Sequence, residues 1–448
     1  MGKRSDLKRH QKRFESHLRC PANLDTEVDD RVLIGSREAT LGHRARDLGN
    51  SVRSAVDGRG SWLLVGSTVT FVYLAWTLLT LMHGSAQDFI HVGRSFVEGS
   101  QASPVISGFH GYRYDGDIGY DGQFNYFMAL DPVRAASYTD YPAYRYTRIV
   151  YPAVAGLLGG HNPDLVANTL IAINLAMIAL GVAVLGAWLR RRGRSAWLAA
   201  VYGFYPGIYV ALQRDTSEIM AFSLVIVAIY LYDVAPRLRF VLPAAFFALA
   251  GLTRETTLVF AYLWGLDLLL SGNGRLRHRV ATNWRGFLIF LAISFGPLLA
   301  WKIFLLVWLG SLGLEGVLTP IPFSGIHYLI RHEVEMEQLR TVVVPAFLCL
   351  VAGAIAIYAG SRKVETWALL TNALLYTAFL SSPSFEDFTS SARVMVPIAL
   401  ALVLAVPYLP QRAKTLFWVS AALWLAPMIF WIMLPVEGGL QELIVHRL

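Results

Sequence analysis

The sequence is poor in cysteine and in charged residues. Only two cysteines occur among 448 residues, Cys20 in a polar segment and Cys349 inside an apolar run, so no disulfide framework holds the chain together. Charged residues make up 16% of the chain, against about 25% in an average protein, while apolar residues reach 55%. This composition excludes an ordinary soluble enzyme.

The motifs of several common enzyme classes are also missing. The sequence contains no Walker-type phosphate loop, no HExxH motif, no CxxC pair and no GxSxG motif. Its 11 histidines are scattered, so a metal site would have to be assembled from separate loops. We therefore predict no metal-ligating residues and leave the cofactor open, a divalent metal included.

Apolar runs of about 20 residues recur along the chain, which is the length that a helix needs to cross about 30 Å of hydrocarbon. Hydropathy predicts an all-α integral membrane protein with about eleven transmembrane helices between residues 61 and 434. We expect these helices at 61–82, 165–189, 195–212, 217–234, 238–253, 256–271, 286–309, 341–360, 364–381, 393–409 and 415–434.

Basic residues between the predicted helices indicate the orientation. The net charge of +8 would suggest nucleic acid in a soluble domain, but the positive-inside rule explains it better here. When the N-terminus is placed inside, every basic cluster falls on the same side: 190–194, 236–239, 275–285, 361–363 and 411–414. We expect a protein of the inner or plasma membrane with the basic tail 1–60 in the cytoplasm, the tail 435–448 outside and no nucleic-acid partner.

The segment 83–164 is the longest connection between predicted helices. It has roughly 80 residues, and connections of that length are usually functional or disordered. Its many aromatic residues argue against disorder, so we expect a large, structured extracytoplasmic loop. Other segments on the same side carry carboxylates and arginines at the ends of apolar helices, where a charge is costly and is usually paired or functional.

Two aspartates of this loop are candidates for chemistry. Asp121 lies beside Gly122 in the aromatic stretch 119–126, where the backbone can approach a ligand closely and aromatic faces can stack on a sugar ring. An Asp-Gly pair is also an ordinary turn. Asp88 follows the first predicted helix by a few residues and is either a second candidate or a helix-capping residue.

Arginines at the predicted membrane boundary form the second group of candidates. Arg145 and Arg148 alternate with tyrosines, as in the aromatic belt of many membrane proteins, yet arginine is also the best bidentate ligand for phosphate. Arg254 and Arg393 lie at the outer ends of apolar helices. Arg254 is either a phosphate ligand or part of a structural ion pair with one of three carboxylates: Asp215, Glu218 and Glu255.

Several motifs in a fixed order resemble a known family. They are Tyr120-Asp121-Gly122-Gln123-Phe124 with Ala129-Leu130-Asp131-Pro132, then Arg145 to Pro152, Asp215-Thr216-Ser217-Glu218, Leu252-Thr253-Arg254-Glu255-Thr256 and, more weakly, Ala392-Arg393-Val394 to Pro397. Together they look like the bacterial branch of the GT-C membrane glycosyltransferases, in particular mannosyltransferase-like proteins including the GPI mannosyltransferase II group. The order of the motifs carries this resemblance more than any single motif.

The resemblance implies a GT-C-like fold and a sugar donor attached to polyprenyl phosphate. It implies that an aspartate of the first outer loop is the catalytic base, which Asp121 fits by motif and Asp88 by its closeness to the first helix. The Asp-Glu pair that protein O-mannosyltransferases carry after that helix is absent, so we expect a glycan or glycolipid acceptor. The substrate-binding candidates are Tyr120, Gln123, Arg145, Arg148, Asp215, Glu218, Arg254, Glu255 and Arg393.

Chemistry supports this donor class independently of the resemblance. Nucleotide sugars are made in the cytoplasm, whereas the candidate residues face outside, so a donor must arrive attached to lipid. Its phosphate needs cationic ligands at the membrane boundary, which Arg148, Arg254 and Arg393 can supply. Two other interpretations stay open: a transporter or lipid flippase whose charges line a path, and a non-catalytic scaffold on the same fold. A transporter would carry these charges near the middle of its helices.

Overall fold

The computed structural model describes five stretches of the chain: 58, 60–98, 114–314, 318–332 and 336–432. The chain divides into two units, 1–58 and 59–448, and the description below concerns the second unit. The predicted tail 435–448 and nearly all of the predicted tail 1–60 lie outside the described residues. Within the described part the chain is helical and forms no strand, as the sequence predicts.

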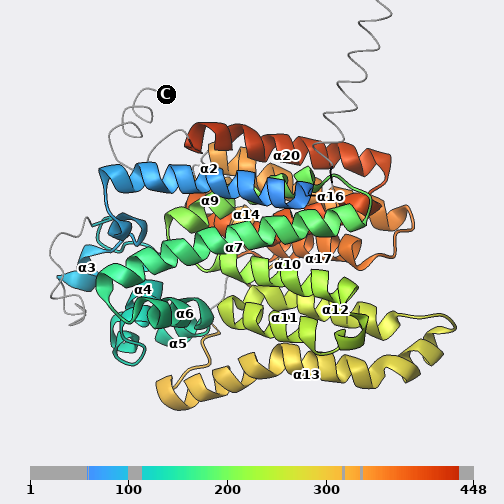
Figure 1. The fold of residues 1–448 in the computed structure, drawn as a ribbon, viewed down its shortest axis with the longest axis horizontal. Helices are drawn as coiled ribbons and strands as arrows, with labels where there is room; N and C mark the ends of the chain where they lie inside the picture. The colour runs from blue at the N-terminus through green and yellow to red at the C-terminus, as the bar shows by residue number, and fades with distance from the viewer. Residues whose placement is uncertain (1–57, 59, 99–113, 315–317, 333–335, 433–448) are drawn as a thin grey trace, which may run out of the picture. The chain divides into compact units, whose positions relative to one another are not determined.

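The helices follow one another from residue 61 to residue 432 (Figure 1). The α-helices are α2 (Ser61–His83), α3 (Arg94–Val97), α4 (Gly122–Leu130), α5 (Pro142–Tyr146), α6 (Val150–Gly159), α7 (Pro163–Arg191), α8 (Ala199–Gly203), α9 (Pro206–Gln213), α10 (Glu218–Val234), α11 (Leu242–Thr253), α12 (Leu258–Leu270), α13 (Leu276–Leu309), α14 (Ser324–Arg331), α15 (Met336–Gln338), α16 (Val344–Tyr358), α17 (Val364–Ala378), α18 (Phe388–Val394), α19 (Val396–Ala405) and α20 (Gln411–Ile432). Short 3-10 turns lie between them: η1 (Ala86–Phe89), η2 (Arg134–Tyr138), η3 (Ala196–Leu198), η4 (Pro236–Leu238), η5 (Glu255–Thr257), η7 (Ser382–Phe385) and η8 (Val406–Tyr408). A π-helical turn, η6 (Leu339–Val343), leads into α16.

Among the described residues, four helices are long and apolar enough to cross a membrane: α2, α7, α13 and the continuous run Leu339–Tyr358. A fifth would be α18 together with Val396–Tyr408, which meet at a bend of 41°. These apolar helices support the membrane protein expected from composition. The count of about eleven spans stays a prediction.

Several predicted spans are broken or short for local reasons. The predicted helix 195–212 divides into η3, α8 and α9, because Pro206 begins α9 and the preceding Tyr205 is held in an extended conformation. Helices α11 and α12 have 12 and 13 residues. At 1.5 Å per residue they are about 18 and 20 Å long, shorter than the roughly 30 Å of bilayer hydrocarbon.

Helix packing places the core around α10 and α19. Helices α2 and α7 lie side by side, and Gly66 permits this, since a Cβ there would lie 2.8 Å from the Cβ of Ala183 (Figure 1). Helix α10 packs against both α7 and α11, and α17 packs against α19. All 10 residues of α19 are buried, as expected for a helix that is apolar on every side.

The predicted outer loop 83–164 folds into short helices where it is described, and residues 99–113 lie outside the description. Every residue of α4 is buried, and this helix packs against α6 and α7. The start of α4 thereby comes to lie against the turn between α9 and α10. The start of α4 forms part of the wall of the site described next, and the turn packs behind it.

Candidate active site

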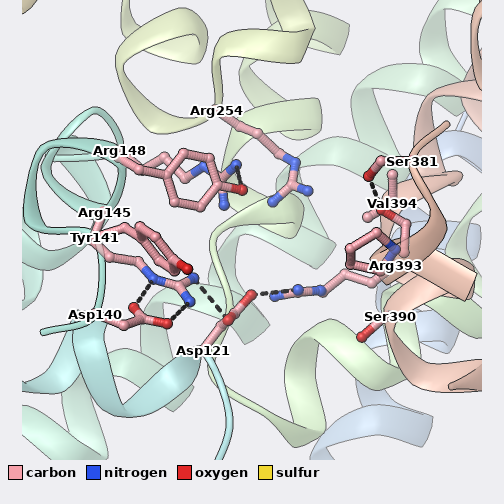
Figure 2. A pocket seen from close by; sticks show the side chains of 13 residues that line it. Asp121, Asp140, Tyr141, Arg145, Arg148, Arg254, Ser381, Ser390, Arg393 and Val394 are labelled. Atoms are coloured by element: carbon pink, nitrogen blue, oxygen red, sulfur yellow. Dashed lines mark hydrogen bonds and ion pairs between the residues drawn. The ribbon is translucent and has the colours of Figure 1, made fainter. Parts of the chain in front are cut away.

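A cavity of about 300 Å³ opens where segments far apart in the sequence meet (Figure 2). Its wall comes from the start of α4, the segment around α5, the turn between α11 and η5, and the segment from η7 to α18. Four arginines, two aspartates and two tyrosines line it, namely Arg145, Arg148, Arg254, Arg393, Asp121, Asp140, Tyr141 and Tyr144. The structure thus gathers five of the eleven predicted site residues around one cavity: Asp121, Arg145, Arg148, Arg254 and Arg393.

Asp121 precedes the first residue of α4 and binds two of the arginines. Its Oδ1 accepts a hydrogen bond from Nη1 of Arg145 at 2.7 Å, and its Oδ2 accepts one from Nη2 of Arg393 (Figure 2). Burial raises the pKa of Asp121, but the two guanidinium groups outweigh burial and hold the pKa well below its usual value. The carboxylate is therefore ionised at neutral pH and, in this arrangement, is a weak base.

Gly122 allows α4 to begin so close to the turn between α9 and α10. A Cβ on Gly122 would clash with the backbone carbonyl oxygen of Arg214. Asn125, one turn further along α4, donates from Nδ2 to the carbonyl oxygen of Asp215 at 3.0 Å. The Asp-Gly pair of the sequence motif therefore orients the carboxylate and also secures the packing of α4.

Arg145 of α5 is held by two aspartates. Its Nε and Nη2 donate to the carboxylate of Asp140 at 2.7 and 2.9 Å, so that Nη1 points to Asp121. The guanidinium group also lies 4.5 Å from the centre of the Phe124 ring. Sequence reasoning missed Asp140, although it lies in the same tyrosine-rich stretch as Arg145.

The cavity has aromatic side chains on its wall. Tyr141 has a φ of 43°, in the left-handed region that is uncommon for residues other than glycine, and its side chain is 65% exposed. The hydroxyl of Tyr144 accepts a hydrogen bond from Nη2 of Arg148 at 2.7 Å. Pro142 after Tyr141 was the only local signal for this turn, and it indicates a helix start rather than a binding residue.

Arg148 and Glu255 form a bidentate ion pair. Nε of Arg148 donates to Oε2 at 3.0 Å, and Nη2 donates to Oε1 at 2.8 Å. Burial raises the pKa of Glu255, but Arg148 outweighs burial and lowers the pKa to about 2. Glu255 therefore binds Arg148 and not Arg254, its neighbour in sequence.

Glu218, the first residue of α10, is fully buried and joins two arginines of the cavity. Its Oε1 accepts a hydrogen bond from Nη1 of Arg254 at 2.6 Å and lies 3.1 Å from Nε of Arg393. Of the three carboxylates that the sequence left open as partners of Arg254, the structure selects this one. The guanidinium group of Arg254 points toward the centre of the cavity (Figure 2).

Two predicted site residues lie behind the wall of the cavity. Gln123 is fully buried, where its Oε1 accepts from Gly93 N at 3.0 Å and its Nε2 donates to the carbonyl oxygen of Ile118 at 2.7 Å. Asp215 is also fully buried, with a φ of 45°. Within the described residues neither of its carboxyl oxygens has a hydrogen-bond partner, and burial raises its pKa well above the usual value.

Tyr120 supports an arginine instead of lining the cavity. Its ring contacts two guanidinium groups, with Arg214 at 4.3 Å and Arg393 at 5.0 Å from the ring centre. Its hydroxyl accepts a hydrogen bond from Oγ1 of Thr389 at 3.2 Å. These contacts orient Arg393 toward Asp121.

Asp88, the other candidate base, belongs to the start of η1. Its Oδ2 accepts a hydrogen bond from the backbone N–H of Ser85 at 2.6 Å, and the two residues form a capping box. It does not line the cavity. The capping alternative that the sequence allowed for Asp88 is the arrangement in the structure.

Each arginine of the cavity is paired with a carboxylate. Within the described residues no three His, Cys, Asp or Glu side chains gather as metal ligands, and the carboxylates of the cavity bind arginines. No family model, no curated protein and no solved structure matches this chain. A functional assignment therefore depends on the residues of the cavity and on the motifs in the sequence.

Proposed function

We propose that the protein is a GT-C-type membrane glycosyltransferase that moves a sugar from a polyprenyl-phosphate donor to an extracytoplasmic glycan or glycolipid. One observation carries this proposal: four arginines from three separate segments line a single cavity that also holds Asp121. Guanidinium groups are the preferred bidentate ligands of phosphate. The apolar helices around the cavity suit a phosphate that is carried on a lipid.

The donor phosphate and Asp121 compete for the same arginines. In the structure, Arg145 and Arg393 hold the carboxylate of Asp121 and keep its pKa low. When a phosphate binds these arginines, part of their charge is neutralised, and the pKa of Asp121 rises toward its usual value. Donor binding thus converts Asp121 from a weak base into one that can accept the proton of a hydroxyl.

The transfer step follows from these positions. The acceptor oxygen forms a bond to the anomeric carbon as the bond from that carbon to the phosphate oxygen breaks. The hydroxyl proton goes to Asp121, and the polyprenyl phosphate leaves with the bonding electron pair. Attack opposite to the leaving group inverts the anomeric configuration, while Arg254 and Arg393 stabilise the charge on the departing phosphate.

Sugar transfer by the purified protein in liposomes tests the proposal, with a polyprenyl-phosphate sugar as the donor. A positioned general base contributes about 10²–10⁴-fold to rate, so Asp121→Asn should slow turnover by such a factor. Asp140→Asn is the matched control, because it also removes a carboxylate from Arg145 on the same wall. It should slow turnover less than Asp121→Asn does, and Asp88→Asn should retain most of the turnover.

The outcomes separate the base assignment from the function. If Asp88→Asn abolishes transfer and Asp121→Asn does not, the base is misassigned and the glycosyltransferase stands. If the wild-type protein transfers no sugar, or both variants keep full turnover, the proposed mechanism is rejected. If the wild-type protein does transfer sugar, glycolipid profiling of intact cells that lack the protein would identify the sugar and the acceptor.

A further inference from the structure

Tyr141 and Asp140 form the end of the active-site cavity that lies opposite Arg393 across Asp121 (Figure 2). We propose that this end is an acceptor subsite, in which the Tyr141 ring stacks on the face of a sugar and Asp140 binds one of its hydroxyls. The proposal rests on the proposed sugar transfer and specifies that the accepting hydroxyl belongs to a sugar ring.

Tyr141 provides an open aromatic surface in this cavity. Its side chain is 65% exposed, and within the described part of the chain no ring, guanidinium group or hydrogen-bond partner engages it. Tyr144, the other tyrosine of the wall, is engaged, because the guanidinium group of Arg148 lies 4.5 Å from its ring centre. A sugar ring has an apolar face of C–H groups that packs on an open aromatic ring. Tyr141 is therefore available for such a ligand.

The backbone of Tyr141 is held in place by its neighbours. Its φ of 43° costs free energy for a residue with a side chain and persists only where the surroundings fix it. The carbonyl oxygen of Tyr141 accepts from the N–H groups of Tyr144 at 2.9 Å and Arg145 at 3.1 Å. A Cβ on Gly313 would clash with the carbonyl oxygen of Ala143, so this segment also packs tightly from outside. A surface fixed in this way loses less entropy when it binds a ligand.

Asp140 has free capacity to accept a sugar hydroxyl. Its two oxygens accept one hydrogen bond each from Arg145, at 2.7 and 2.9 Å, and its side chain is 33% exposed. Each carboxylate oxygen has two lone pairs, so a further hydrogen bond to each is open. The carboxylate thus suits the hydroxyl edge of a sugar, as the Tyr141 ring suits its face.

The order of groups across the cavity assigns this subsite to the acceptor. Arg145 binds Oδ1 of Asp121 and Arg393 binds Oδ2, and the two arginines lie on different sides of the carboxylate (Figure 2). In an inverting transfer, the leaving phosphate and the attacking hydroxyl lie on opposite sides of the anomeric carbon. With the phosphate on Arg254 and Arg393, the acceptor approaches from the side of Arg145 and Tyr141.

A neighbouring cavity gives the acceptor room to extend. It has a volume of about 250 Å³ and is lined by Tyr141, Pro142, Ala143, Leu309 and Ser311. Because Tyr141 lines both cavities, a sugar that stacks on its ring can continue away from the arginines. The second cavity thus accommodates the next part of a glycan or glycolipid.

Saturation-transfer NMR of the full-length protein in detergent tests the subsite without turnover. The probes are methyl glycosides of mannose, glucose, galactose and arabinose, with glycerol as a hydroxyl compound that lacks a ring face. The wild-type protein and Tyr141→Phe should transfer saturation to the ring protons of a glycoside and not to glycerol. Tyr141→Asn should lose this signal, since asparagine tolerates a positive φ but has no ring. Tyr138→Asn is the matched control, because Tyr138 ends η2 in the same loop and does not line the cavity.

Transfer kinetics in liposomes, with the same glycosides as acceptors, distinguish the acceptor from the donor. Tyr141→Asn should raise the KM for the glycoside about tenfold, the size of one aromatic contact, with little change in kcat or in the donor KM. Tyr141→Phe and Tyr138→Asn should keep all three values. A tyrosine that only belongs to an aromatic belt at the membrane boundary would change none of them.

The outcomes separate the subsite from the proposed function. No NMR signal from any glycoside, an equal signal in Tyr141→Asn, or an unchanged glycoside KM would overturn the subsite while normal transfer keeps the function. A rise in the donor KM alone would overturn the assignment to the acceptor. A Tyr141-dependent signal in a protein that transfers no sugar would support the sugar subsite and reject the glycosyltransferase. Tyr141→Gly keeps the test decisive if Tyr141→Asn does not fold, because glycine adopts a positive φ freely.

Discussion

Two arginine clusters lie at the two ends of α10. Both consist of arginine–carboxylate ion pairs, but the pairs have different surroundings. The pocket cluster contains Arg145, Arg148, Arg254 and Arg393 with Asp121, Asp140, Glu218 and Glu255. The Arg192 cluster contains Arg192 with Asp233 and Glu365. Glu218 begins α10 and Asp233 lies near its end, so a single helix contributes a carboxylate to each cluster.

The clusters differ in what their guanidinium groups face. Arg192 lies 3.6 Å from the centre of the Trp188 ring and donates to the hydroxyl of Tyr408 at 2.8 Å. Its contacts join α7, α10, α17 and η8, which is a packing role. The arginines of the pocket cluster instead line a cavity of about 300 Å³. Since desolvation offsets much of the attraction in a buried ion pair, cationic groups around a cavity are better suited to binding than to stability.

We expect the two ends of α10 to differ most in their accessibility to a reagent added outside the cell. In a Cys20→Ser background, Val133→Cys places a thiol at an exposed position of the predicted outer loop. Arg191→Cys places one close to the Arg192 cluster, while the remaining Cys349 is buried. An impermeant maleimide should label Val133→Cys in intact cells, and Arg191→Cys only after permeabilisation. Labelling of Arg191→Cys in intact cells would reverse the orientation predicted from the basic clusters.

The second comparison concerns stability. Glu218→Gln removes the carboxylate that Arg254 and Arg393 share and leaves both arginines buried without it. Breaking a buried ion pair typically costs about 3–5 kcal/mol, and we expect a loss of that order in denaturant unfolding in detergent micelles.

Glu365→Gln is the matched substitution in the Arg192 cluster. Arg192 keeps Asp233 and Tyr408 as partners, so we expect a loss of about 1 kcal/mol, the size of a single hydrogen bond. If the two variants lost the same stability, the pocket cluster would have no special dependence on Glu218.

The third comparison separates donor binding from folding. Arg254→Lys keeps the charge but loses the bidentate geometry of guanidinium, so the apparent affinity for the polyprenyl-phosphate donor should fall about tenfold. Protein yield should stay normal, because lysine can still pair with Glu218. Normal yield with unchanged donor affinity would show that Arg254 is no phosphate ligand, and a loss of yield would point to a structural role.

The smallest expected effect is in the pH dependence of stability. The pKa of Asp121 in the folded protein lies below its usual value of about 3.9, so its contribution to stability is complete above about pH 5 and is lost as the pH falls. The advantage of the wild-type protein over Asp121→Asn in thermal unfolding should therefore shrink from pH 5 to pH 3. An advantage that stays constant over this range would mean that the two arginines do not hold the carboxylate.

Most charged residues of the cavity could be named from sequence because each lies at the edge of an apolar or aromatic run. This signal identified Asp121, Arg145, Arg148, Arg254 and Arg393. It missed residues whose role depends on a turn, such as Asp140 and Tyr141. It also included Gln123 and Asp215, which are buried behind the cavity, because a motif does not show toward which side of the backbone a side chain points.

The sequence by itself determined an all-helical chain with apolar helices of membrane-spanning length. Composition and the length of each apolar run determine which segments partition from water into the bilayer. Only the tertiary structure decided which charges pair. Arg254 and Glu255 are neighbours, yet Arg254 has an extended backbone after the end of α11, and the two side chains bind Glu218 and Arg148. The choice of partner depends on how helices distant in the sequence pack together, because an ion pair forms across a few ångströms of space whatever the separation along the chain.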